Sequence, residues 1–250
     1  MKISRNKLRD LIISEIKIDG FDFHSSLEKK IWEDEDSIKD DVRDNLLEIC
    51  RDFLESLPID VTETDVRLTG SLANYNWSKY SDIDLHIQVD FAEIDDDFDL
   101  LRAYFSSVTA LWNLKHDIKI KGYEVEIYVE NTGEDHISTG IYSVKDEEWI
   151  VQPVKEQSHD IDKKAVRKKA KSISDQISEL SRVKDPKEVY DLSEKLKAKI
   201  RRMRQSGLQT KKAQYSTGNI AFKVLRRSGD LNRLTDIKND AYDKIFSIKQ

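Results

Sequence analysis

The chain has 250 residues, of which 38% are hydrophobic and 36% are charged, which is enough for one large domain or two modest ones with a buried core. No apolar segment approaches the ~20 residues that cross a bilayer and no secretory leader is visible, so we expect a cytoplasmic protein without membrane contact. The single cysteine, Cys50, excludes an internal disulfide and a cysteine-rich zinc site.

Two amphipathic helices are predicted before the first strand. Apolar residues recur at helical spacing over 3–16 and again over 37–57, where Pro58 ends the pattern. Cys50 lies within the apolar stripe of the second helix, so we interpret it as a buried thiol without catalytic chemistry.

The predicted strand 66–68 leads into Gly70 and Ser71. Glycine permits a tight turn, and serine can cap a helix while it offers its hydroxyl and nearby backbone N–H groups to an anion. We therefore expect a short helix after Ser71 and a phosphate-binding turn at Gly70–Ser71. Trp77 and Tyr80, farther along, suit either stacking on a base or sugar or a place in the core.

The next strand carries two carboxylates. Asp82 and Asp84 are two residues apart, so their side chains leave the same face while the alternating apolar residues point into the core. Two adjacent like charges need a cation, and hard oxygen donors suit Mg²⁺, so the pattern predicts a two-metal site for phosphoryl or nucleotidyl transfer. His86 shares this face, as a metal neighbour or as a structural residue. The same Asp-x-Asp spacing at 95–99 lacks both a strand pattern and a Gly-Ser turn.

A third carboxylate is expected on a later strand. After a predicted helix over 98–114, the segment 118–129 reads as a strand or hairpin in which Glu126 interrupts an apolar run. An acidic residue there is hard to explain as surface decoration, so we choose Glu126 as the third ligand. Glu124 shares its face and is the alternative.

These residues together resemble the DNA polymerase β-like nucleotidyltransferase superfamily, over roughly residues 60–150. The resemblance implies a mixed sheet with flanking helices. It implies that Asp82 and Asp84 hold two Mg²⁺ ions, that Glu126 is the third ligand and a candidate base, and that Gly70 and Ser71 bind the triphosphate. Many members have aspartate where this chain has Glu126.

The remainder of the chain changes from strands to helices. Strands over 140–144 and 149–151 complete an α/β half, and strand patterns nearly vanish after Pro153. We therefore expect a nucleotidyltransferase domain with its N-terminal helices over 1–153 and an all-helical domain over 154–250. The predicted helices of the second domain are 161–182, 186–206, 216–227 and 234–248.

The two halves differ in charge. Residues 1–150 hold 17 basic and 35 acidic residues, whereas residues 151–250 hold 25 basic and 13 acidic residues. Basic runs at 163–171, 195–204 and 211–227 are simply solvated in one reading, but together they favour a polyanionic partner.

The sequence thus predicts an enzyme that transfers a nucleoside monophosphate from a nucleoside triphosphate to an acceptor hydroxyl, with release of pyrophosphate. We expect an RNA acceptor, such as a tRNA 3′ end, bound by the basic helices. The alternatives are a small-molecule, protein or nucleotide acceptor, a toxin of a toxin–antitoxin pair, and a catalytically silent nucleic-acid-binding module. No feature of the sequence indicates a particular oligomeric state.

Overall fold

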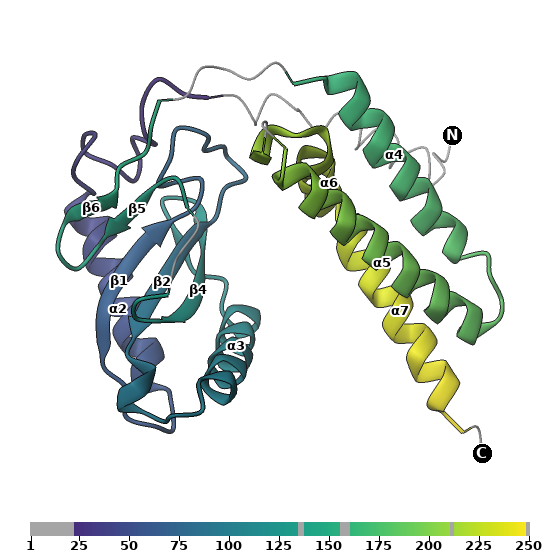
Figure 1. The fold of residues 1–250 in the computed structure, drawn as a ribbon, viewed down its shortest axis with the longest axis horizontal. Helices are drawn as coiled ribbons and strands as arrows, with labels where there is room; N and C mark the ends of the chain where they lie inside the picture. Colours follow the sequence, from purple (N-terminus) through teal and green to yellow (C-terminus); the bar gives the residue numbers. More distant parts are fainter. Residues whose placement is uncertain (1–22, 135–137, 156–160, 211–212, 249–250) are drawn as a thin grey trace. The chain divides into compact units, whose positions relative to one another are not determined.

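The structure is a computed structural model that describes residues 23–134, 138–155, 161–210 and 213–248. These residues divide after 158 into two compact units. In Figure 1 the first unit, coloured from purple to teal, holds a sheet with helices, and the second, coloured from green to yellow, is helical.

The first unit is built on one mixed sheet. Its strand order is β3-β4-β2-β1-β5-β6, with β2 and β4 parallel and the other pairs antiparallel. A parallel pair needs a crossover, which here contains η2 (Phe91–Glu93) and α3 (Phe98–Lys115). This mixed sheet with helices confirms the predicted α/β class. The strands are β1 (Glu63–Thr69), β2 (Ile83–Val89), β3 (Lys119–Ile120), β4 (Tyr123–Asn131), β5 (Ile141–Ser143) and β6 (Glu148–Val151).

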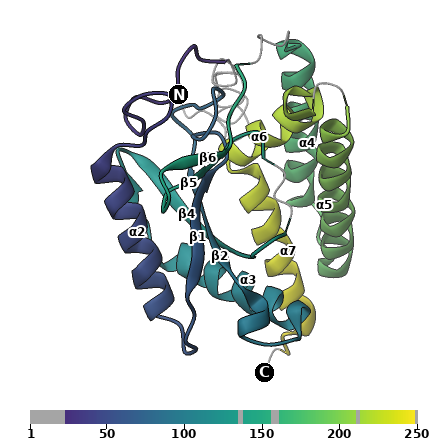
Figure 2. The same cartoon turned by 60° about the vertical axis from the view of Figure 1, so that its left-hand side comes forward.

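One hydrophobic core joins the sheet to α2 (Asp40–Glu55) and α3. Helix α2, which runs along the sheet in Figure 2, buries a stripe that includes Val42, Leu46 and Phe53. The ring of Phe53 meets that of Trp112 on α3 edge-on, with centroids 5.5 Å apart. The alternate residues of β2 that begin with Ile83 are fully buried in this core, so the other residues of β2 face away from it.

Helix α3 also protects the exposed edge of β4. The Asn113 side chain donates from Nδ2 to the carbonyl of Ile127 and accepts from its backbone N–H, both at 3.0 Å. Because β3 pairs only with the first two residues of β4, Asn113 replaces a missing neighbouring strand at this point.

The second unit consists of four helices, within the part of the chain that the structure describes. Asp162, Asp185 and Ser216 cap the first three of them, each accepting a hydrogen bond from a backbone N–H in the first turn. The fourth begins earlier than predicted, because Gly229 takes a left-handed conformation (φ 75°) and turns the chain directly into it. The helices are α4 (Lys163–Leu180), α5 (Pro186–Leu208), α6 (Thr217–Arg227) and α7 (Asp230–Phe246), with η3 (Ala213–Tyr215) before α6.

The prediction of a short helix after Ser71 is wrong, because residues 71–80 form turns. Their backbone carbonyls bind an earlier segment of the chain rather than the next helical turn. The carbonyl of Leu72 accepts from Trp32 Nε1 at 2.8 Å, and the carbonyl of Tyr75 accepts from the His24 N–H at 2.7 Å. These long-range bonds replace the helical ones.

The predicted helix over 3–16 lies outside the described residues. In the residues that the structure does describe, no helix combines the length and the apolar character needed to span a bilayer.

Candidate active site

The polar residues of the neighbouring strands β2 and β4 lie on the sheet face opposite the core, and this surface is named the polar face. Because alternate residues point to opposite sides, each polar residue of β2 has a polar partner beside it on β4. The predicted ligands Asp84 and Glu126 are therefore direct neighbours on adjacent strands. The pairs in register are Asp84 with Glu126, His86 with Tyr128, and Gln88 with Glu130.

Gly70 lies against Asp84 from the other side. Thr69, the last residue of β1, pairs with Asp84, and Gly70 follows in a left-handed conformation (φ 73°). A Cβ atom on Gly70 would lie 1.9 Å from Oδ2 of Asp84, far inside van der Waals contact. Both the backbone conformation and the close approach therefore require glycine at this position.

Ser71 is connected to the residue before Asp82. Its hydroxyl donates to Oγ of Ser81 at 2.7 Å, and the Ser78 backbone N–H donates to the same oxygen at 2.9 Å. These bonds draw both ends of the 71–81 loop together beside the start of β2. Since no helix begins at Ser71, an anion here would meet a hydroxyl and loop N–H groups rather than a helix dipole.

The predicted ligands all raise the pKa of the Tyr128 phenol. Its hydroxyl donates to Oε2 of Glu126. Burial is the largest cause of the raised pKa of this phenol, and the hydrogen bond to Glu126 is the second. The negative charges of Glu126, Asp84 and Asp82 raise the pKa further. All three predicted ligands therefore act on one half-buried phenol.

Glu124, the alternative third ligand, lies two residues before Glu126 on β4, level with Asp82 rather than with Asp84. It pairs with Lys119 of β3 at the outer edge of the sheet and is exposed. The pKa of Glu124 is raised, first by a hydrogen bond with Asp117 and then by burial. In register it precedes the start of β2, so Glu126 and not Glu124 lies beside Asp84.

His86 belongs to a second row of the polar face. Its Nδ1 lies 2.8 Å from Oε1 of Glu130, whose Oε2 accepts from Gln88 at 3.0 Å. The imidazole stacks on Tyr128, with centroids 4.8 Å apart. The sequence reasoning missed Tyr128 and Glu130, although the same two-residue alternation that selected Glu126 places both on its face.

Arg67 is a positive charge in this row, paired in register with His86. Its Nε donates to Oδ2 of Asp65 at 2.7 Å, and Oδ1 of Asp65 accepts from Ser143 at the same distance. Asp65 is 7% exposed, so this charge is buried but fully hydrogen-bonded.

The donor set suits a hard divalent cation, although the side chains do not converge as they lie. Among the described residues, no group of three or more His, Cys, Asp or Glu side chains is arranged to hold a metal ion. Asp84 and Glu126 are nevertheless adjacent, and Asp82 precedes the same strand by one residue. Carboxylate oxygens are the donors that Mg²⁺ prefers, so the residues fit the ion in chemistry and in position along the strands.

The aromatic residues between the turn and the aspartates have different surroundings. Trp77 stacks on His24 with centroids 3.7 Å apart and donates from Nε1 to the carbonyl of Ser26, which favours the structural interpretation. Tyr80 is 44% exposed, and the Lys79 ammonium lies 4.9 Å from the centroid of its ring.

The acidic cluster at 95–99 forms a helix cap. Asp97 accepts from the Leu100 N–H at the start of α3, and Asp95 accepts from the Asp97 N–H. Its Asp-x-Asp spacing therefore has a structural explanation.

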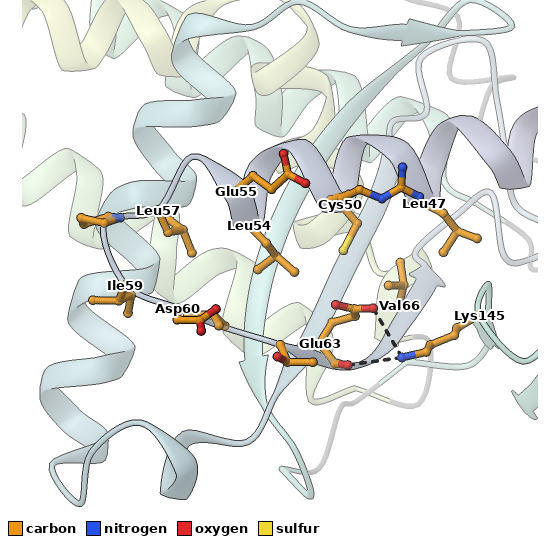
Figure 3. Close-up of a pocket in the computed structure, with 14 residues that line it drawn as sticks. Leu47, Cys50, Leu54, Glu55, Leu57, Ile59, Asp60, Glu63, Val66 and Lys145 are labelled. Carbon is orange, nitrogen blue, oxygen red and sulfur yellow. Dashed lines mark hydrogen bonds and ion pairs between the residues drawn. The ribbon is translucent and has the colours of Figure 1, made fainter.

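A cavity of about 660 Å³ lies apart from the carboxylates, between the end of α2 and β1 (Figure 3). Leu54 and Val66 line it, and Lys145 reaches the Glu63 side chain at its rim. Cys50 also lines it, and burial raises the pKa of this thiol to about 12. The thiol is thus neutral at physiological pH, as expected for a structural cysteine.

Six of the exposed basic residues of the second unit form two rows of three, each row on one helix face. Residues spaced by four and three positions share a helix face. The α5 basic row is exposed and lies on the outer side of a helix whose inner side buries Leu196 and Ile200. The α4 basic row is Lys164, Lys168 and Lys171, and the α5 basic row is Lys195, Lys199 and Arg202.

Within these rows, two residues have side-chain partners that are described. Lys171 pairs with Asp175 at 3.1 Å, and Lys199 donates to Gln176 Oε1 at 2.9 Å. The first pair lies within α4, and the second bond joins Lys199 of the α5 basic row to α4. Comparisons of the whole chain with protein-family models, with curated proteins and with solved structures found no match.

Proposed function

We propose that the protein is a Mg²⁺-dependent nucleotidyltransferase that moves a nucleoside monophosphate from a nucleoside triphosphate to an acceptor hydroxyl. The observation that supports this most directly is the contact between Gly70 and Asp84. It joins the Gly-Ser turn to the carboxylate strand at a distance where a side chain would not fit. The Gly-Ser turn follows β1, and the acidic residues lie on β2 and β4, which are the next two strands of the sheet. This order supports the nucleotidyltransferase arrangement.

The residues of the chain would act mainly by positioning and by charge. Ser71 would exchange its hydrogen bond to Ser81 for one to the triphosphate, and backbone N–H groups of the 71–81 loop would add further bonds. Asp82, Asp84 and Glu126 would hold the Mg²⁺ ions. When bound, the ions would neutralise the triphosphate and favour ionisation of the acceptor hydroxyl.

The acceptor oxygen would form its bond to the α-phosphorus as the bond to pyrophosphate breaks, and the acceptor proton would pass to the Glu126 carboxylate. Because this reaction changes little covalently in the protein, the positions of the turn and the carboxylates decide the rate.

An RNA acceptor is our further proposal, and the α4 and α5 basic rows support it. A surface of exposed lysine and arginine attracts a phosphate backbone, and each neutralised phosphate adds a salt-dependent contribution. The acidic first unit alone would repel RNA.

The test is label transfer from each α-labelled nucleoside triphosphate, with Mg²⁺, in the presence and absence of total RNA. The informative variant is D82N/D84N, which removes two charges without changing shape. The matched control is D95N/D97N, with the same spacing and the same chemical change, since asparagine caps a helix as well as aspartate.

We expect label in RNA with the unsubstituted protein and the control, and none with D82N/D84N. Label in a small molecule, in protein or in a second nucleotide would support the chemistry and overturn the RNA acceptor. Growth arrest that depends on Asp82 and Asp84 would assign the same chemistry to a toxin. Absence of label, with RNA binding equal in all three proteins, would leave a silent binding module.

A further inference from the structure

The neighbours of Glu126 indicate a role for a residue outside the predicted ligand set. Tyr128 donates a hydrogen bond to Oε2 of Glu126, which leaves Oε1 to bind a metal ion. Glu126 lies beside the Asp84 carboxylate, and two neighbouring carboxylates repel each other when no cation is present. A fixed donor on the same strand would keep it beside Asp84 instead of letting it turn toward solvent.

The ring of Tyr128 is itself held in place. His86 stacks on it at 4.8 Å, nearly parallel with an interplanar angle of 22°. Glu130 binds His86 Nδ1 at 2.8 Å and the Gln88 amide at 3.0 Å. His86 and Gln88 are only 8% and 1% exposed, so this second row is a rigid support for the phenol.

The direction of this hydrogen bond follows from the two groups. A carboxylate can only accept and a phenol carries a proton to donate, so Tyr128 is the donor and Glu126 the acceptor.

We propose that Tyr128 is a positioning residue that holds the Glu126 carboxylate for divalent-cation binding beside Asp84, with the His86–Glu130 pair fixing its ring. This inference rests on the proposed function. Ligating carboxylates are commonly held by such outer hydrogen bonds, and loss of the outer partner lowers metal affinity by about 10–100-fold.

The test uses Tyr128→Phe, which removes the hydroxyl and leaves the ring on His86. The matched control is Tyr104→Phe on α3, because the buried hydroxyl of Tyr104 has no hydrogen-bond partner among the described residues. The probe is Mn²⁺ alone, titrated into the full chain and followed by the electron paramagnetic resonance signal of the free ion. Thermal unfolding of each protein reports whether the fold is intact.

We expect the Mn²⁺ dissociation constant to rise about 10–100-fold in Tyr128→Phe and to stay unchanged in Tyr104→Phe. In label transfer, the Mg²⁺ activation constant should rise in parallel while the KM for the nucleotide stays constant. Equal or tighter Mn²⁺ binding by Tyr128→Phe would overturn this inference and leave the proposed function intact. Failure of the unsubstituted protein to bind Mn²⁺, or unchanged binding by D84N, would overturn the proposed function and this inference with it.

Discussion

Replacement of Gly70 by alanine should have two effects: strain in the backbone and displacement of the Asp84 carboxylate. The residue has φ 73°, a left-handed conformation that costs an alanine about 1–2 kcal/mol. Its new Cβ would lie 1.9 Å from Oδ2 and 2.9 Å from Cγ of Asp84. The carboxylate must therefore move by more than about 1 Å, at a further cost of about 0.5–1.5 kcal/mol if it leaves its rotamer.

Gly122 provides the matched control. It also has a left-handed backbone (φ 93°), yet a Cβ there would meet nothing within 4 Å. Gly122→Ala should thus lose the backbone contribution alone, about 1–2 kcal/mol, and Gly70→Ala somewhat more. Each kcal/mol corresponds to about 2–4 °C in the unfolding temperature of a protein of this size.

The two variants should differ far more in label transfer than in stability. A displacement of 1 Å in a reacting group can cost about 100-fold in rate, so we expect a loss of that order for Gly70→Ala and none for Gly122→Ala. Mn²⁺ binding should weaken only in Gly70→Ala. If Gly70→Ala transferred label and bound Mn²⁺ as well as Gly122→Ala does, the contact between the turn and Asp84 would have no functional importance.

Three further predictions concern other parts of the structure. Asn113→Ala removes both hydrogen bonds to the Ile127 backbone and should lower the free energy of urea unfolding by about 1–3 kcal/mol. The Cys50 thiol ionises near 9.0 when unfolded but near 12 in the fold, so its stabilising contribution, complete below pH 9, should be lost between pH 9 and 12. The unfolding free energy of Cys50→Ala should fall less over that range. Replacement of all three residues of the α5 basic row with glutamine should weaken RNA binding. The slope of log K against log salt concentration should fall by about 0.7 for each phosphate that the row no longer neutralises.

Each of these three predictions has a clear contrary result. An unfolding free energy for Asn113→Ala equal to that of the unsubstituted protein would show that the two hydrogen bonds to Ile127 contribute nothing. An identical alkaline fall with and without Cys50 would assign that fall to other groups. For RNA, the control replaces Lys184, Lys187 and Lys244 with glutamine, which removes the same charge elsewhere in the unit. If the two triple substitutions weakened RNA binding equally, the α5 basic row would contribute only through the net charge of the unit.

Much of the fold could be predicted because local patterns decide it. The two-residue alternation in β2 and β4 and the apolar stripes of the helices are visible in the sequence. The prediction of a helix after Ser71 was wrong because Trp32 and His24, about forty and fifty residues earlier, donate hydrogen bonds to backbone carbonyls of the 71–81 loop. No local pattern reports such partners.

The site could be predicted in composition but only partly in arrangement. The choice between Glu124 and Glu126 depends on the register of β2 against β4. A two-residue shift of this register leaves every side chain on the same face, so the alternation of the strands does not decide it. Tyr128 could have been found, since it shares the face of Glu126. Its hydrogen bond to that carboxylate and its support by His86 depend on tertiary contacts.

The parallel pairing of β2 with β4 means that the candidate site forms in two stages. The β1–β2 hairpin, which brings Gly70 to Asp84, joins residues close in sequence and has a small loop-closure entropy. Glu126 arrives only after the whole crossover has closed, a slower step because the contact is non-local. A nascent chain that has emerged only as far as α3 would have the turn and both aspartates but not Glu126, so the cation binding that we propose would begin only when synthesis has passed β4.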